Sequence, residues 1–158
     1  MRRQFSDAER LERASLRVAQ HIRGLYEEKG SSDTRLLEAL LLPDELTVMG
    51  RSKAWSGGGR REHVVPRRVV IEHCHNMIEA GEKDAAVAAF IREHVKIVLI
   101  TKDEAARLDS SAQLGLRQTM PAGWQVGDDV YARLHAAGIE WTPASADHEY
   151  LKPDHARS

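Results

Sequence analysis

Residues 60–66 place an acidic residue directly beside a histidine, inside a basic part of the chain. A carboxylate such as that of Glu62 can hold a divalent cation through its oxygen atoms. The imidazole of His63 can accept a proton from water near neutral pH, because its usual pKa is about 6.5. Two β-branched residues and Pro66 follow, which predicts that the pair lies at the end of a strand. Since successive strand side chains point to opposite faces, the two groups reach one water molecule only where the strand twists or bends.

Residues 62–66 read Glu-His-Val-Val-Pro. This run resembles the signature of the HNH, or ββα-metal, nucleases, which opens with an Asp-His pair before a short apolar stretch. The resemblance covers residues 46–109 and implies a metal-dependent endonuclease that hydrolyses DNA phosphodiesters. Carried over by position, it implies that His63 is the catalytic general base and that Glu62 is a metal ligand.

The same resemblance implies the rest of the core and of the metal site. Residues 95–100 would form the second strand, a helix would begin at Lys102, and residues 67–94 would form a helical insertion between the two strands. The family supplies a His, Asn or Asp from the final helix, where this chain offers Asp103, Glu104 and Asp109. The expected metal ligands are Glu62, Asp103 and Glu104. The implied cofactor is a divalent metal ion, Mg²⁺ first, with Mn²⁺, Ni²⁺ or Zn²⁺ as alternatives.

The charge of the chain is balanced overall but uneven along it. There are 23 Lys and Arg residues against 24 Asp and Glu residues, yet residues 51–68 carry six basic residues and one acidic residue. We expect this segment to bind an anionic partner such as the phosphate backbone of DNA. A solvated, arginine-rich loop is the alternative. The predicted nucleic-acid-binding residues are Arg51, Lys53, Arg60, Arg61, Arg67 and Arg68.

Two candidate site residues also have structural explanations. Glu62 can neutralise Arg61 or Arg67 instead of binding a metal ion. Glu104 follows Thr101 at the spacing of a capping box, in which a Thr hydroxyl and a Glu carboxylate each accept a backbone N–H at a helix start. The capping role is the favoured interpretation of Glu104.

Composition limits the class of protein. A length of 158 residues with 42% hydrophobic side chains fits one domain with its own core. No stretch approaches the roughly 20 apolar residues of a membrane helix, so no membrane association is predicted. The single cysteine, Cys74, excludes an internal disulfide and favours the cytoplasm.

Local patterns predict an α+β fold with a ββα-metal-like core. We expect one HNH-like domain over residues 1–141 and a disordered tail over residues 142–158. Within the domain, residues 1–43 are an N-terminal helical pair, residues 44–109 are the core, and residues 110–141 are a loop and a C-terminal helix.

The helices are marked by capping residues and apolar spacing. Ser6 and Glu9 cap a long amphipathic helix that ends at Gly30. Asp33 begins a short second helix that stops at Pro43. Its inner side is formed by Leu36, Leu37, Leu40 and Leu41.

Later in the chain the pattern predicts both strands and helices. Pro66 begins a helix, residues 84–93 form another, and a last helix ends at Gly138. Three β-prone segments, residues 46–49, 61–65 and 95–100, supply the strands.

Two other classes of function stay open. One is a catalytically inactive module that binds nucleic acid through residues 51–68. The other is a small adaptor or inhibitor of phage or mobile-element origin, acting through protein–protein contacts, with the four leucines of the second helix facing a partner.

Overall fold

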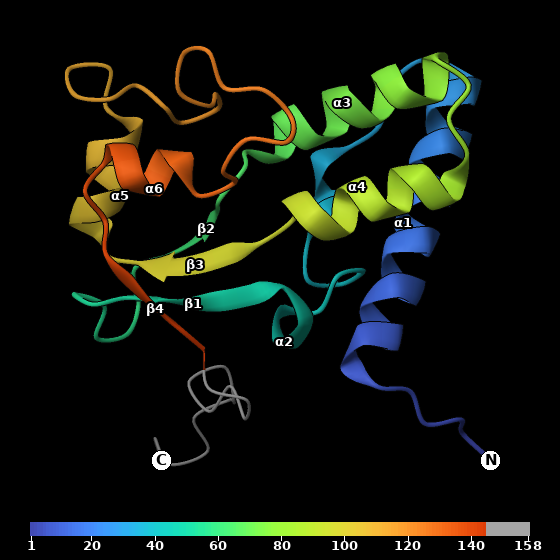
Figure 1. Cartoon of the computed structure of the whole chain (residues 1–158), viewed down its shortest axis with the longest axis horizontal. Helices are drawn as coiled ribbons and strands as arrows, with labels where there is room; N and C mark the ends of the chain where they lie inside the picture. The colour runs from blue at the N-terminus through green and yellow to red at the C-terminus, as the bar shows by residue number, and fades with distance from the viewer. Residues whose placement is uncertain (145–158) are drawn as a thin grey trace.

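The computed structural model describes residues 1–144 of the chain. These residues form an α+β fold around one four-stranded sheet with the strand order β2-β3-β1-β4 (Figure 1). The α+β class predicted from the sequence is therefore confirmed. The strands are β1 (Val48–Ser52), β2 (Arg60–His63), β3 (Ile97–Ile100) and β4 (Trp141–Pro143).

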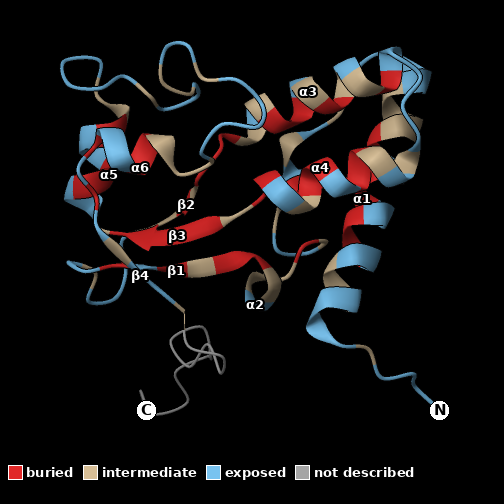
Figure 2. Ribbon diagram, in the orientation of Figure 1, coloured by how far each residue is buried: buried red, intermediate tan, exposed pale blue. Residues whose placement is uncertain are grey.

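Strand β3 lies inside the sheet, parallel to β1 on one side and antiparallel to β2 on the other. Its four residues are all buried, as a run of Ile, Val and Leu requires when both faces of a strand are covered (Figure 2). Strands β1 and β2 follow each other in the sequence, yet β3 separates them in the sheet. The two extended segments predicted on either side of the glycines therefore exist but do not pair with each other.

The helices surround the sheet unevenly. Helices α1, α3 and α4 pack against one another at one end of the molecule, and α5 and α6 lie at the other end (Figure 1). Val98 and Ile100 of β3 belong to the main buried core, whereas Ile97 and Leu99 form a small second cluster with Val48. The helical elements are α1 (Asp7–Lys29), the 3₁₀ helix η1 (Thr34–Leu37), α2 (Asp44–Thr47), α3 (Arg67–Glu79), α4 (Asp84–His94), α5 (Lys102–Asp109) and α6 (Ala132–Ala136).

Most of the predicted helices are confirmed. Their ends are predictable because capping residues within the same few positions of the sequence set them. The Ser6 hydroxyl accepts a hydrogen bond from the Glu9 backbone N–H at 3.2 Å, and α1 stops at Gly30, whose φ of 72° suits glycine. Helices α3, α4 and α5 begin within one residue of the expected positions.

The short helix predicted between Asp33 and Pro43 is right about its start, which Asp33 caps, but wrong about its length. Only the single turn η1 forms, because the backbone becomes extended at Glu38 (φ −94°, ψ 174°) and its carboxylate pairs with Arg61 and Arg67. Leu37 is buried as expected, but Leu40 is 93% exposed. Leucine spacing alone does not reveal this, since the contact that ends the turn involves residues far along the chain.

Strand β4 includes residues that the sequence assigns to a disordered tail. It pairs antiparallel with β1, with Gly50 opposite Pro143. A Cβ atom at Gly50 would lie 2.0 Å from the Thr142 backbone oxygen, so glycine is what permits this close approach. Thr142 and Pro143 are thus strand residues, which corrects the tail prediction there. The rest of that prediction, residues 145–158, lies outside the described residues.

Within residues 1–144, none of the helices combines the length and the apolar composition that crossing a membrane requires.

Candidate functional site

An open cavity of about 320 Å³ lies beside β2, which is an edge strand of the described sheet. Its walls come from β2, the start of α3, the end of α5 and the loop that follows α5. Five guanidinium groups line it, against two carboxylates, those of Glu62 and Asp109. The arginines are Arg60, Arg61, Arg67, Arg68 and Arg117. So many guanidinium donors around a concave site favour an anionic ligand.

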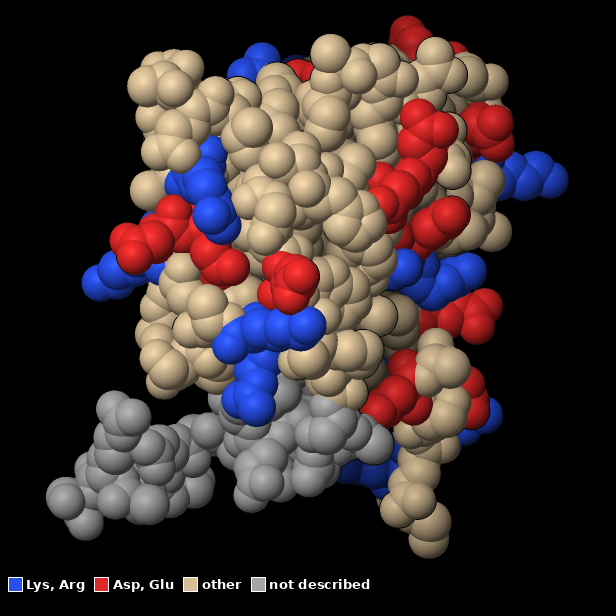
Figure 3. Space-filling view, turned by 60° about the vertical axis from the view of Figure 1, so that its left-hand side comes forward, with Lys and Arg blue, Asp and Glu red and all other residues tan. Residues whose placement is uncertain are grey.

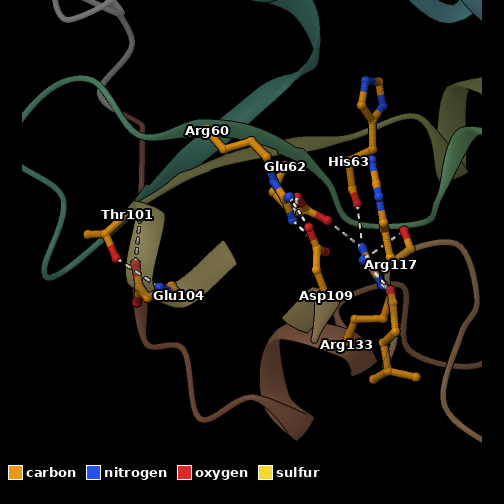
Figure 4. Close-up of polar contacts among 9 residues, drawn as sticks. Arg60, Glu62, His63, Thr101, Glu104, Asp109, Arg117 and Arg133 are labelled. Atoms are coloured by element: carbon orange, nitrogen blue, oxygen red, sulfur yellow. Dashed lines mark hydrogen bonds and ion pairs between the residues drawn. The ribbon is translucent and has the colours of Figure 1, made fainter. Parts of the chain in front are cut away.

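The pairing of β2 with β3 directs Glu62 and His63 to opposite sides. Glu62 lies opposite Val98, which faces the main core, and His63 lies opposite Ile97, which faces the second cluster. Figure 4 shows the His63 ring pointing away from the side chains that surround Glu62. Strand alternation therefore separates the two groups that the sequence places together.

Arg133 is the partner of Glu62 that the sequence did not reveal. Its side chain is completely buried on the short helix α6. Its Nη1 donates to Glu62 Oε1 at 2.7 Å and to the His63 backbone oxygen at 2.8 Å. Its Nε donates to the Leu116 backbone oxygen at 2.9 Å. Its Nη2 donates to the backbone oxygens of Leu116 and Arg117. Arg133 thereby joins β2 to the loop after α5 (Figure 4).

Glu62 pairs with two arginines, Arg60 and Arg133. Neither is Arg61 or Arg67, the partners expected from the sequence. The Glu62 carboxylate is 8% exposed and lies 2.6 Å from Arg60 Nη2, in addition to its contact with Arg133. Arg60 also binds both oxygens of Asp109, and this hydrogen bonding lowers the pKa of the Asp109 carboxyl. Both Glu62 oxygens thus face cations of the protein, an arrangement that does not fit a metal ligand.

On the other side of β2, the Glu38 carboxylate contacts three basic side chains. Its Oε1 lies 2.5 Å from Arg67 Nη1 and 3.3 Å from His63 Nε2, and its Oε2 lies 3.2 Å from Arg61 Nη1. The contact with His63, together with the two arginines, lowers the pKa of Glu38 to about 2. Arg61 is further held by Asp44 at 2.5 Å. No local pattern marks Glu38 in the sequence, because its three partners come from segments distant in sequence.

His63 is nearly enclosed. Its side chain is 11% exposed, and within the described part of the chain neither ring nitrogen has a partner with hydrogen-bond geometry. His63 is among the residues around the arginine-rich cavity, and its Nε2 lies 3.3 Å from Glu38 Oε1. His63, the predicted general base, therefore lies near an arginine-rich cavity and beside Glu38, and its ring is directed away from Glu62.

The other two expected metal ligands lie on α5. Glu104 forms the predicted capping box: its Oε1 accepts from the Thr101 backbone N–H at 2.9 Å, and the Thr101 hydroxyl accepts from the Glu104 N–H at 3.1 Å. The same Oε1 accepts from the Ser52 hydroxyl at 2.6 Å, which joins α5 to β1. Asp103 is exposed in the first turn. The favoured structural role of Glu104 is confirmed.

The expected ligands do not fit a divalent ion in this arrangement. Glu62 is bound by two guanidinium groups, and Glu104 is bound by Thr101 and Ser52. Among residues 1–144, no group of three or more His, Cys, Asp or Glu side chains is placed to hold a metal ion.

The six basic residues predicted to bind nucleic acid fall into two groups. Arg60, Arg61, Arg67 and Arg68 line the cavity, and each has an acidic partner, Asp109, Asp44, Glu38 and Glu72 respectively. Arg51 and Lys53 lie at the end of β1 and just beyond it. The Arg51 guanidinium lies 5.8 Å from the centre of the Trp55 ring, and the Lys53 ammonium lies 3.0 Å from Glu140. The structure thus brings four of the six together.

Arg117 differs from the other cavity arginines. It is exposed, and among the described residues no carboxylate lies within 4.0 Å of its guanidinium group. Its charge nevertheless contributes to the lowered pKa of Asp109, after the larger effect of Arg60. On the face shown in Figure 3, basic and acidic side chains are interspersed rather than gathered into one basic surface. The cavity therefore gathers guanidinium groups that are mostly paired with carboxylates, and Arg117 is the cavity arginine without such a partner among residues 1–144.

No protein-family model, curated protein or solved structure matches the chain.

Proposed function

We propose that the cavity beside β2 binds a phosphate group of a nucleic acid, with DNA as the expected partner. The observation that carries this proposal is the lining of five guanidinium groups against two carboxylates around a space of about 320 Å³. Guanidinium groups bind phosphate oxygens through pairs of N–H donors, and phosphate is the anion that nucleic acids repeat along their backbone.

Two features support an anion at this place. Arg117 is free of an acidic partner within the described residues, so its donors are open to a ligand. Arg67 and Arg68 are the first two residues of the 13-residue helix α3, and its N-cap, Pro66, supplies no side-chain hydrogen bond. The first backbone N–H groups of a helix and its dipole add positive potential there.

A divergent ββα-like core is part of the proposal. Strands β2 and β3 pair antiparallel and α5 follows β3 directly, while α3 and α4 lie between the two strands in the sequence. This order agrees with the one that the HNH resemblance implies. The binding function does not depend on it, since the cavity arginines act through charge and hydrogen bonding.

The test is the affinity of the protein for fluorescently labelled DNA, measured by anisotropy at several salt concentrations between about 50 and 200 mM. Replacing Arg117 by Gln should weaken binding about tenfold at low salt, because one charge-assisted contact is lost. It should also reduce the slope of log affinity against log salt by about 1.

Arg107→Gln is the matched control, since Arg107 is exposed on α5 and lies outside the cavity. Equal affinities of the Arg117 variant, the Arg107 variant and the wild type would refute phosphate binding in this cavity.

Metal-dependent cleavage of DNA is a second candidate, because His63 is among the residues around the same cavity. It requires the His63 ring, whose nitrogens are buried, to become accessible, and Glu62 and Glu104 to exchange their present partners for a metal ion. Incubation of plasmid DNA with the protein and Mg²⁺, Mn²⁺, Ni²⁺ or Zn²⁺ tests it. Nicking by the wild type that His63→Ala abolishes, at a nearly unchanged melting temperature, would support the nuclease. Intact plasmid in every metal would remove this candidate and leave the binding function in place.

A further inference from the structure

A second cavity, of about 580 Å³, adjoins the arginine-rich one. The two share Arg68 and Gln118 in their walls. We infer that together they hold one nucleotide of a single strand, with its phosphate in the first cavity and its base in the second. The inference rests on the proposed phosphate binding and names the form of nucleic acid that the site accepts.

The walls of the second cavity are chemically unlike those of the first. Val69, Met120, Pro121, Trp124 and Val126 contribute most of its apolar lining. Bases bind to proteins through their flat faces, which prefer aromatic and apolar side chains. A phosphate has no favourable contact with such a lining, so the two cavities suit the two different parts of a nucleotide.

The lining of the second cavity is held in place before any ligand binds. The Trp124 indole N–H donates to the Asp129 backbone oxygen at 2.8 Å, and the ring meets the edge of His94 at a centroid distance of 6.4 Å. The Gln125 backbone N–H donates to Asp128 Oδ2 at 2.8 Å, which fixes the turn next to Val126. A preformed site avoids the entropic cost of ordering the loop upon binding.

The shared wall carries the polar groups that a base edge needs. Arg68 lies between the cavities, with its Nε 2.9 Å from Glu72 Oε1 and its Nη1 3.4 Å from Gln118 Oε1. The Gln118 oxygen therefore faces Arg68, and Gln118 brings its side-chain amide to the boundary of the two cavities. Hydrogen bonds from such groups distinguish a base from a generic apolar ligand.

A base can enter the second cavity only when it is neither stacked nor paired within a double helix. We therefore expect the protein to prefer single strands, although a duplex carries the same phosphates. This preference separates the inference from simple electrostatic binding, which a duplex satisfies at least as well.

The experiment compares three labelled probes of about ten nucleotides by anisotropy: a single strand, the same strand with every base removed, and the duplex. The wild type should bind the intact single strand about tenfold more tightly than the base-free strand. It should also prefer the single strand to the duplex.

Val126→Gln replaces an apolar wall of the base cavity by a polar one, at a residue that is 45% exposed, so the fold should be retained. This variant should bind the intact and base-free strands equally, with the affinity of the wild type for the base-free strand. Leu114→Gln, also at an exposed apolar position but outside both cavities, should behave as the wild type.

Equal binding of intact and base-free strands by the wild type, or a preference for the duplex, overturns the inference while the phosphate site stands. A preference for the intact strand that survives Val126→Gln overturns it as well. Failure of all three probes to bind overturns both the inference and the proposed function.

Discussion

Arg133 and Glu62 form a buried ion pair that spans 71 positions of the sequence. The arginine is fully buried and the carboxylate is 8% exposed, so each needs the other to offset the loss of hydration. Because Arg133 also donates to backbone oxygens of the loop after α5, this one side chain ties the wall of the cavity to β2.

Replacing Arg133 by Met should lower the free energy of unfolding by about 3 to 5 kcal/mol. The change keeps much of the side-chain volume but leaves Glu62 with one cationic partner and removes the donor from three backbone oxygens. Urea denaturation measures the effect. Arg107→Met, at an exposed position of α5, should change stability by less than about 0.5 kcal/mol, and a similar loss in both variants would contradict the structural role of Arg133.

Glu38→Gln should change how stability depends on acid. The pKa of Glu38 is lowered from 4.5 to about 2 in the folded state, first by its contact with His63. Since the folded-state pKa lies below the unfolded one, the ionised carboxylate stabilises the fold above pH 4.5, and this contribution is lost as the pH falls toward 2.

The measurement is the free energy of unfolding at several pH values across that window. The wild type should lose stability more steeply than the Gln variant, and the two should converge at the acid end. Glu12→Gln, on the exposed surface of α1, is the surface control. Parallel curves for the wild type and Glu38→Gln would show that the Glu38 carboxylate contributes nothing to the pH dependence of the free energy of unfolding.

Thr101→Ala should cost about 1 kcal/mol of stability, because the hydroxyl that accepts the Glu104 N–H is removed from a buried helix start. Thermal unfolding followed by circular dichroism measures it. Ser6→Ala, which removes the cap at the exposed start of α1, should cost less. The opposite ranking would contradict the larger contribution of the cap at the start of α5.

Gly59→Ala should destabilise the protein more than Gly58→Ala. Both residues have positive φ, of 70° and 65°, so both substitutions strain the backbone by about 1 kcal/mol or more. A Cβ atom at Gly59 would also lie 2.1 Å from the Ile100 backbone oxygen, whereas one at Gly58 meets nothing within 4 Å. Chemical denaturation of the two variants side by side tests this, and equal losses would argue against the close approach of β2 and β3.

The sequence predicts those parts of the fold whose causes are local. Ser6 and Gly30 set the ends of α1, and Thr101 with Glu104 sets the start of α5, through bonds within a few residues. The strand at residues 97–100 follows from its apolar, β-branched composition. The position of β3 between β1 and β2 does not, because strand order depends on contacts between distant segments.

The site was predictable only in part for the same reason. A cluster of arginines around residues 60–68 is visible in the sequence, and four of them line the cavity. Nothing near Arg133 or Arg117 distinguishes them from surface arginines. The alternation of side chains along a strand did indicate the separation of Glu62 and His63, which the pairing with β3 then fixed.

The order of the chain has a consequence for how the molecule is made. During synthesis from the N-terminus, Glu62 leaves the ribosome 71 residues before Arg133 does. Before Arg133 is made, the Glu62 carboxylate has only Arg60 as a cationic partner, although β3 at residues 97–100 is already available to pair with β2. The Glu62–Arg133 ion pair can therefore form only when nearly all of residues 1–144 has been translated. A premature stop before α6 yields a product in which Glu62 lacks its buried partner Arg133.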